Sequence, residues 1–396
     1  PGGGPGGAPG GPGGAGEPEG GESPEEAGDQ DAQRAVSHGL PPTPKVHMGA
    51  CFSKVFNGCP LNIHSCASWV HSHTRDQYLI FGAEEGIYCL NLNEIHEDTI
   101  EKLVAQRCTW LYVLNNVLMS VSGKSSQLYS HNLVAMFDQK RTNHRSLSIS
   151  ANRLTDRIIP RKTPTTIKVA DTRGCKKCCV VRNPHTLATF LCAVVQGGVM
   201  LLQWYEPLER FMLLKYVSVS LPQPLNLFEM LVFPDDDCPR ACVGVWGLAH
   251  TDHPLTFQNI PLGNPSSHPS SPTVGTLLGA THVCQMDRDS VLVCVDNWVR
   301  MVNLRGEPSC ALPAIVTFRF PIETMVCLQD SVLAFWKHGM QGKSLLTNEV
   351  TQEITDESRI FRVLGTHRDI ILESRPIDNP TAHSNIYLLT GHQSSY

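Results

Sequence analysis

The tripeptide His367-Arg368-Asp369 matches the start of a protein-kinase catalytic loop, in which the aspartate accepts the proton of the substrate hydroxyl. That loop also needs a metal-binding asparagine five residues after the aspartate, and Ser374 stands there instead. The sequence Asp-Phe-Gly, which holds magnesium in kinases, does not occur in the chain. The tripeptide is therefore predicted to be a turn between two strands, 359–364 and 369–374, and no phosphoryl transfer is expected.

Two Gly-Lys-Ser triplets, 123–125 and 342–344, resemble the end of a phosphate-binding loop. Such a loop has another glycine five residues before the glycine of the triplet, because the backbone must wrap closely around phosphate. The chain has Leu118 and Lys337 at those positions. Neither triplet can form the cradle, and both are predicted to be hairpin turns.

One cysteine cluster could do chemistry: Cys175, Cys178 and Cys179 flank Lys176 and Lys177. A structural zinc ion needs four ligands, usually two pairs, and the chain has no second Cys-x-x-Cys pair. The lysines would lower a thiol pKa and so favour a reactive thiol. The third alternative, which we favour, is that these cysteines pack inward at the start of a strand. We expect no catalytic, metal or cofactor-binding residue in this chain.

The elements that position these residues are short strands. From about residue 50, runs rich in β-branched and aromatic residues alternate with turn signals such as Asn115-Asn116 and Gly197-Gly198. The runs are 76–93, 108–133, 178–216, 226–247, 281–308, 322–347 and 359–391. At about 40–50 residues a unit, residues 55–391 hold about seven units, each the size of a propeller blade. The sequence predicts an all-β fold, a seven-bladed β-propeller of the WD40-like kind.

Three segments depart from the strand pattern. Residues 93–104 have apolar side chains near helical spacing and are predicted to form a helix. The polar stretches 138–166 and 261–275 are predicted to be long loops. The strand around 54–64 has no partner nearby in sequence, so we expect it to close the ring by pairing in the final blade.

The chain divides into two regions. Residues 1–45, rich in glycine, proline and glutamate, contain few large apolar residues and are predicted to be a disordered acidic linker. Residues 46–396 are predicted to be the propeller. Pro41 and Pro44 have the spacing of an SH3 ligand, although the end of a linker is the favoured interpretation.

Charge and apolar patterning exclude two classes of partner. Residues 1–50 hold seven acidic side chains against Arg34 and Lys45, so the rest of the chain carries 30 of each sign and is neutral. A neutral body attracts phosphate backbones weakly, and nucleic-acid binding is not expected. The most apolar run, 189–205, is too short and too interrupted to span a membrane. The 15 cysteines lie mostly in apolar runs, which indicates buried free thiols and a cytoplasmic protein.

Several long runs carry a family resemblance. They are 74–88, 108–112, 122–133, 326–344 and 348–365, with 41–61 and 378–396 at the two ends. These runs resemble the citron homology (CNH) domain at the C-terminus of the germinal-centre-kinase group, the mitogen-activated protein kinase kinase kinase kinases. The resemblance covers about residues 41–396 and implies a β-propeller that regulates a Ser/Thr kinase domain.

The resemblance also implies partners. Such domains dock small GTPases, adaptor proteins and downstream kinases of the Jun N-terminal kinase cascade, and recruitment to a membrane through a partner is consistent with this role. ATP and magnesium are expected only for the kinase domain of a parent protein, because this chain lacks the kinase motifs.

Three sets of residues are candidate partner contacts because polar turn residues lie beside aromatic or basic ones. They are Glu84 and Glu85; Trp336, Lys337 and His338; and Lys140, Arg141 and Arg145. Two other functions stay open. The propeller could self-associate or fold back on its own kinase domain, or Cys175, Cys178 and Cys179 could form a thiol-redox site.

Overall fold

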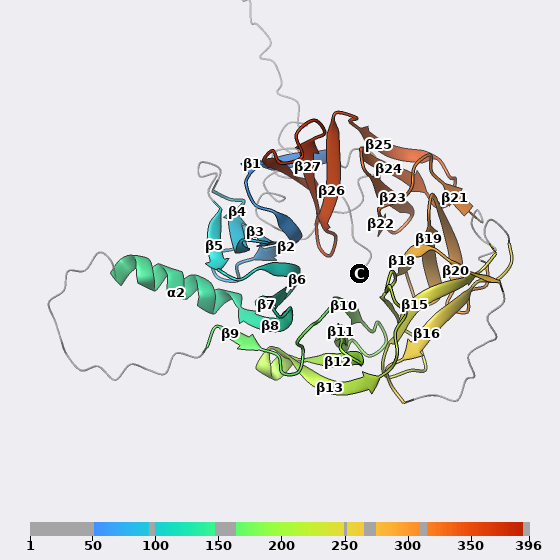
Figure 1. The fold of residues 1–396 in the computed structure, drawn as a ribbon, viewed down its shortest axis with the longest axis horizontal. Coiled ribbons are helices and arrows are strands. Elements are labelled where there is room, and N and C mark those ends of the chain that lie inside the picture. The colour runs from blue at the N-terminus through green and yellow to red at the C-terminus, as the bar shows by residue number, and fades with distance from the viewer. Residues whose placement is uncertain are drawn as a thin grey trace, which may run out of the picture.

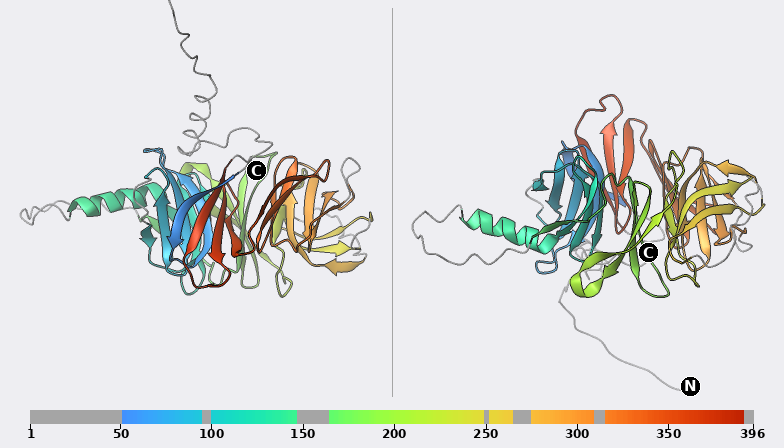
Figure 2. Two further views of the ribbon diagram at one scale, coloured as in Figure 1. Left: turned by 90° about the horizontal axis from the view of Figure 1, so that it is seen from above. Right: turned by 60° about the horizontal axis from the view of Figure 1, so that its bottom comes forward.

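In the computed structural model, the described residues are 51–94, 100–146, 164–248, 252–264, 275–308 and 315–390. They form seven sheets of four strands, arranged around a common axis like the blades of a propeller (Figure 1). Seen from the side, the sheets make a flat ring from whose rim helix α2, Leu133–Ser146, projects (Figure 2). The predicted all-β, seven-bladed fold is confirmed. The predicted linker lies outside the described residues, and its boundary stays a prediction.

The strands of each blade are given from the centre of the ring outward. Blade 1 contains β2 (Ile63–Val70), β3 (Gln77–Ala83), β4 (Gly86–Asn91) and β5 (Glu101–Val104). Blade 2 contains β6 (Cys108–Leu114), β7 (Val117–Ser122), β8 (Gln127–Asn132) and β9 (Thr166–Lys168). Blade 3 contains β10 (Lys177–Arg182), β11 (Thr189–Val195), β12 (Gly198–Tyr205) and β13 (Arg210–Ser218). A 3-10 turn, η1 (Glu206–Leu208), joins β12 to β13.

Blades 4 to 7 complete the ring. Blade 4 contains β14 (Glu229–Leu231), β15 (Arg240–Gly247), β16 (Thr256–Pro261) and β17 (Thr276–Leu278), and its last two strands both pair with β15. Blade 5 contains β18 (Ala280–Gln285), β19 (Ser290–Val295), β20 (Trp298–Asn303) and β21 (Ile315–Thr317), and blade 6 contains β22 (Thr324–Cys327), β23 (Ser331–Trp336), β24 (Gly339–Ser344) and β25 (Val350–Thr355). Blade 7 contains β26 (Arg359–Gly365), β27 (Ile370–Pro376), β28 (Ser384–Thr390) and β1 (Cys51–Cys59).

The ring has two distinct faces because neighbouring strands in a blade are antiparallel. Links from one blade to the next open on one face, together with the hairpins between second and third strands. We call this the crossover face. Hairpins between first and second strands open on the opposite face, and the turn that contains His367 is one of them. That turn separates β26 from β27, as the sequence predicted.

Seven apolar clusters each fill the seam between two neighbouring blades. Successive side chains of a strand point to opposite faces of its sheet, so a middle strand supplies two seams. In β3, Leu79 and Phe81 face blade 7, whereas Ile80 faces blade 2. This burial on both faces explains why the middle strands are continuous apolar runs rather than alternating ones.

Strand β1 closes the ring. It pairs antiparallel with β28, with Lys54 opposite Tyr387 and Phe56 opposite Ile386. Blade 7 therefore combines three strands from the C-terminal part of the chain with one from the N-terminal part, which lie side by side in Figure 1. The predicted closure by the N-terminal strand is confirmed.

The helix predicted over 93–104 is wrong where the structure describes it. Residues Glu101–Val104 form β5, the outer strand of blade 1, and Ile87 pairs with Val104. Leu103 and Val104 pack in the seam between blades 1 and 2. Residues 101–104 therefore adopt a strand because they pair with β4, although the spacing of their apolar side chains favours a helix.

The loop predicted over 138–166 is wrong in its first part, because α2 continues to Ser146. The Asn132 side-chain oxygen accepts the N–H of Ala135 at 3.0 Å and caps the helix. Phe137 anchors it by packing against blade 1, with its ring 4.8 Å from that of Tyr78. Described residues of the range continue only from residue 164.

Two further turn and loop predictions have different outcomes. Gly123-Lys124-Ser125 is the predicted hairpin turn between β7 and β8, whereas Gly342-Lys343-Ser344 belongs to β24, so the second turn prediction is wrong. In the loop predicted over 261–275, residues 265–274 lie outside the described residues.

The closing strand gives the first test of the fold. Phe56 is 7% exposed in the seam between blades 7 and 1, so Phe56→Ala should lower the free energy of unfolding by about 3–5 kcal/mol. Ser53→Ala, at an exposed position of the same strand, should change it by less than about 0.5 kcal/mol. Urea denaturation measures both. Equal effects of the two changes would show that β1 is not bound through its apolar side.

A buried imidazole makes the fold sensitive to acid. His131 lies between the hydroxyl groups of Ser120, 2.7 Å away, and Thr166, 2.9 Å away. Burial lowers the pKa of His131 from 6.5 to about 4. The folded chain therefore keeps this imidazole neutral at pH values where the unfolded chain protonates it.

Because the folded pKa lies below the unfolded one, stability is complete above pH 6.5 and falls as the pH drops toward 4. One titrating histidine gives a slope of at most about 1.4 kcal/mol per pH unit. Denaturation at a series of pH values should show a shallower slope for His131→Gln than for the original chain. An unchanged slope between pH 4 and 6.5 would rule out His131 as the titrating group.

Candidate docking surface

Two of the three predicted contact sets lie on the crossover face. Glu84 and Glu85 form the turn between β3 and β4, and Lys337 and His338 form the turn between β23 and β24, directly after Trp336. A glycine begins the strand after each turn. Gly86 has φ +141° and lies against the carbonyl oxygen of Val104, where a Cβ atom would collide. The local sequence therefore permits a two-residue turn there because the next residue is glycine.

Glu84 and Glu85 are already held by the chain itself. The Glu84 carboxylate lies 2.6 Å from His64 Nε2 and 2.6 Å from Arg107 Nε. The hydrogen bond from Arg107, with that of His64, lowers the Glu84 pKa. Both carboxylate oxygens of Glu85 lie 3.1 Å from the backbone nitrogen of Asn62. Glu85 thus holds the link from blade 7 to blade 1, whereas Glu84 ties β2 to the link from blade 1 to blade 2. A contact with a partner stays a prediction.

Trp336 belongs to a row of aromatic rings. It is stacked on Phe320 with ring centroids 4.9 Å apart and planes 10° apart, and the His338 ring meets it edge-on at 5.3 Å. His338 Nδ1 lies 2.8 Å from the carbonyl oxygen of Arg359 in blade 7. The row is half-buried beside the exposed Lys337. It offers a rigid apolar surface with a neighbouring positive charge, which suits protein recognition.

The basic set lies elsewhere. Lys140 and Arg141 are on α2, which starts on the opposite face and projects from the rim (Figure 1). Lys140 Nζ is 3.0 Å from the Glu101 carboxylate of β5. Arg145 is on the same helix, and its side chain is outside the described part of the structure. The structure does not bring this set together with the other two.

The three predicted thiols divide between two seams. Cys175 and Cys178 have sulfur atoms 3.4 Å apart and lie in the seam between blades 2 and 3. Cys179 packs in the seam between blades 3 and 4, where its sulfur is 3.9 Å from the carboxylate of Glu229. Burial raises the pKa of Glu229 to about 7. No group of three histidine, cysteine, aspartate or glutamate residues in the described part of the chain could hold a metal ion.

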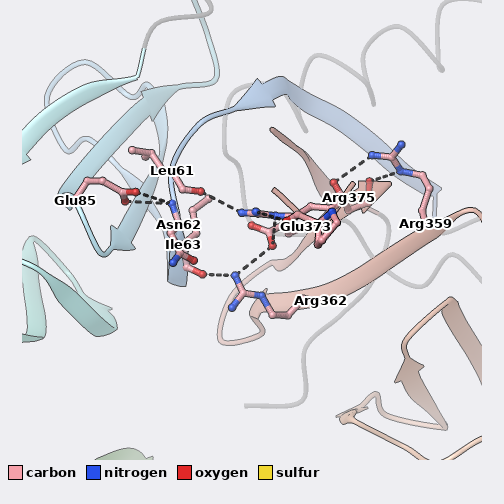
Figure 3. Close-up of polar contacts among 10 residues, drawn as sticks. Leu61, Asn62, Ile63, Glu85, Arg359, Arg362, Glu373 and Arg375 are labelled. Carbon is pink, nitrogen blue, oxygen red and sulfur yellow. Dashed lines mark hydrogen bonds and ion pairs between the residues drawn. The ribbon is translucent and has the colours of Figure 1, made fainter. Parts of the chain in front are cut away.

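A polar junction that the sequence did not predict crosses the seam between blades 7 and 1 (Figure 3). Glu373 of β27 is 4% exposed, and its Oε1 atom lies 3.2 Å from Arg362 and 3.4 Å from Arg375. Arg375 also donates to the carbonyl oxygen of Leu61 at 3.4 Å, and Arg362 to that of Ile63. We call Arg362, Glu373 and Arg375 the closing triad. The position of Glu373 after the apolar run Ile370–Leu372 is the only signal of it in the sequence.

The closing triad continues toward the aromatic row. Arg359 Nε donates to the Ser374 hydroxyl at 2.8 Å, and the carbonyl oxygen of the same arginine contacts His338. On the other side, the Glu85 carboxylate holds Asn62, which follows the Leu61 carbonyl bound by Arg375. Polar contacts thus link the two predicted turns across blade 7 on the crossover face.

A second feature missed by the sequence analysis is an apolar strip on the rim of blade 3. Large apolar side chains that are between 42% and 57% exposed follow one another from the end of β12 through η1 and β13. They are Tyr205, Leu208, Met212, Leu213, Leu214 and Tyr216. β13 is the outer strand of its sheet and pairs only with β12 among the strands that the structure describes, which leaves its other edge as the edge of the sheet. The signal was the run "FMLL" (211–214) in the last strand of a blade.

The closing triad predicts a large stability effect. The double change Arg362→Ala and Arg375→Ala leaves a buried carboxylate without a cation, and should lower the free energy of unfolding by about 3 kcal/mol. Adding Glu373→Gln should restore part of it, because the uncompensated charge is removed. The control, Arg368→Ala in the exposed turn before β27, should change it by less than about 0.5 kcal/mol. Chemical denaturation measures the free energy of unfolding of the original chain, the double variant, the triple variant and the control. If Glu373→Gln restores no stability to the double variant, the triad is contradicted.

Comparison with known proteins identifies the family. The model of the CNH domain family matches residues 75–365. The chain belongs to the CNH domain family. It is a CNH β-propeller domain and not a kinase catalytic domain, which confirms the sequence resemblance and the absence of kinase motifs.

Relatives of this CNH domain include proteins named mitogen-activated protein kinase kinase kinase kinase 3. The rat and human relatives are each 55% identical over 374 residues, which covers 93% of this chain. The match spans 42% of the rat protein and 41% of the human one. The chain therefore spans less than half the length of these relatives.

A solved structure described as the AfRom2 CNH domain has the same fold. It superimposes with a TM-score of 0.55 at 11% sequence identity, over 86% of this chain and 97% of that one. Within the residues that the structure describes, no helix is long and apolar enough to cross a membrane.

Proposed function

We propose that this CNH domain is a non-catalytic docking and regulatory module of a Ser/Thr protein kinase of the mitogen-activated protein kinase kinase kinase kinase type. The names of the 55% identical relatives support the parent kinase. In this proposal the kinase activity, with its ATP and magnesium, belongs to a separate kinase domain. The module itself needs no cofactor and acts in the cytoplasm, where a partner can recruit it to a membrane surface.

The observation that carries the proposal is the aromatic row on the crossover face. Trp336 and Phe320 are stacked and half-buried, and Lys337 is exposed beside them. Protein interfaces concentrate their binding energy in aromatic and cationic side chains held in place before binding. The row is held by neighbouring blades of a closed ring, so little conformational entropy is lost when a partner binds.

The proposed partners are proteins: small GTPases, adaptors and downstream kinases of stress-activated Jun N-terminal kinase signalling. The neutral charge of residues 51–396 argues against nucleic acid. The SH3 ligand predicted at Pro41 and Pro44 lies outside the described residues and remains a proposal.

Binding to a small GTPase gives a direct test. A panel of purified GTPases, each loaded with GDP or a non-hydrolysable GTP analogue, is measured against the CNH domain by calorimetry. We expect one nucleotide form to bind more tightly, because GTPase partners read the nucleotide state. Equal binding of both forms, or none, counts against this class of partner.

Substitutions in the row locate the surface for any partner that binds. Trp336→Ala should weaken binding at least about tenfold. Lys337→Glu, at an exposed position, should weaken it without affecting folding. Tyr205→Ala is the matched control, because that ring is 50% exposed on the rim of blade 3. A loss for Tyr205→Ala but not for the row would move the docking surface to the rim.

Self-association is a second candidate function, and the apolar strip of blade 3 favours it. If two copies of β13 pair antiparallel about Leu214, Met212 lies opposite Tyr216 and no two cations are opposed. A second copy is therefore a chemically compatible occupant of this edge. Sedimentation at several concentrations should show a dimer that Leu214→Lys abolishes. A monomer at all concentrations would leave the restraint of a kinase domain as the alternative structural role.

A further inference from the structure

Cys175 and Cys178 have a geometry that neither docking nor self-association uses. Their sulfur atoms are 3.4 Å apart and in direct contact. A disulfide bond is about 2.05 Å long, so bond formation requires the sulfurs to approach by only about 1.3 Å. The two thiols can therefore react with each other without the help of a third thiol.

The fold holds both cysteines in place. Cys175 lies in the link from β9 to β10, and its N–H donates to the carbonyl oxygen of Ser126 at 2.9 Å. The next N–H, of Lys176, donates to Val194 at 2.9 Å. Cys178 is fixed in β10, where it pairs with Ala193. Backbone hydrogen bonds thus fix the main chain at both cysteines, and this main-chain geometry brings the two sulfur atoms into contact.

The surroundings allow a small oxidant to approach. Cys175 is 5% exposed, but Gly174 and Lys176 on either side of it are exposed, and Cys178 is half-buried. The hydrogen bond between the thiols lowers the pKa of Cys175 and raises that of Cys178. One thiol is thus favoured as the attacking thiolate and the other as the thiol that resolves the intermediate. Burial and Glu229 raise the pKa of neighbouring Cys179 well above its usual range.

We propose that Cys175 and Cys178 form a peroxide-sensitive dithiol that closes to an intramolecular disulfide at the seam between blades 2 and 3. The Cys175 thiolate attacks one peroxide oxygen, the O–O bond breaks, and a sulfenic acid and water result. The Cys178 sulfur then attacks the sulfenic sulfur, the S–O bond breaks, and a second water leaves. Two thiols lose two electrons and two protons, and one hydrogen peroxide becomes two waters. A dithiol reductant reverses the change.

The disulfide would change one defined part of the crossover face. The link that contains Cys175 joins blade 2 to blade 3, and a bond to Cys178 ties it to the first strand of blade 3. Oxidation would thereby restrain this link while leaving the aromatic row of blade 6 unmodified. The proposal stands independently of which partner the domain binds.

Peptide mapping of the whole chain tests the proposal. The protein is treated with hydrogen peroxide, its free thiols are alkylated, and it is digested with trypsin without reduction. Cleavage after Lys176 and Lys177 separates residues 174–176 from 178–182, so only a disulfide keeps these peptides together. We expect the joined peptide, with Cys179 alkylated, to appear with peroxide and to disappear after reduction.

Matched variants assign the bond. Cys175→Ser and Cys178→Ser should each abolish the joined peptide, whereas Cys179→Ser, next to one of the two, should retain it. Circular dichroism confirms that each variant is folded, and the mapping of the unaltered chain stands even if a variant is not. The proposal is overturned if folded protein yields no joined peptide, or if Cys179→Ser abolishes it while Cys175→Ser does not.

Discussion

The pairing of β1 with β28 is the interaction on which the rest of the molecule depends. It joins Lys54 to Tyr387 and turns a row of sheets into a ring. Without it, the seam between blades 7 and 1 would lose Phe56, and the edge of β28 would face solvent. Every other seam is made by blades that are neighbours in sequence. Both structural features of the crossover face depend on the blade that this pairing completes, because the closing triad lies in blade 7 and the aromatic row contacts it through His338.

The closing seam contains a buried carboxylate that is paired with two arginines. Glu373 and its two arginines are costly to desolvate, so they are weak contributors to net stability compared with an apolar replacement. The two arginines contribute instead by positioning the segment that follows β1. Arg375 and Arg362 bind the carbonyl groups of Leu61 and Ile63, which follow β1 in the chain. A shifted register of β1 would move Leu61 and Ile63 away from Arg375 and Arg362, so these hydrogen bonds favour one register of closure.

Much of the fold could be predicted from the sequence because strands and turns of a propeller are local. Asn115-Asn116 and Gly197-Gly198 mark hairpins whose strands the structure confirms. Errors arose where distant residues decide the conformation. Val104 is drawn into a strand by Ile87, and Lys343 lies within β24 rather than in a turn. Residues 138–146 of α2 were predicted to be a loop because they are polar and charged, and the apolar contact that anchors the helix is made by Phe137, just before them.

The candidate site was predictable only in part. Aromatic and polar turn residues such as Trp336 and His338 could be selected by type, but their stacking on Phe320 depends on two blades meeting. The triad was not predictable, because Arg362 and Glu373 are joined only when β26 and β27 are in register. The strip on β13 required knowledge of which strand is outermost.

The composition of blade 7 also determines when the ring can close during synthesis, because its strands come from distant parts of the chain. At about 5–20 residues per second, roughly 20–70 s separate the synthesis of Lys54 from that of Tyr387. Blades 1 to 6 can assemble in the order in which they emerge, whereas β1 precedes all of them and its partner β28 follows all of them. The propeller therefore remains an open arc until β28 has been synthesised, and the ring can close only after that.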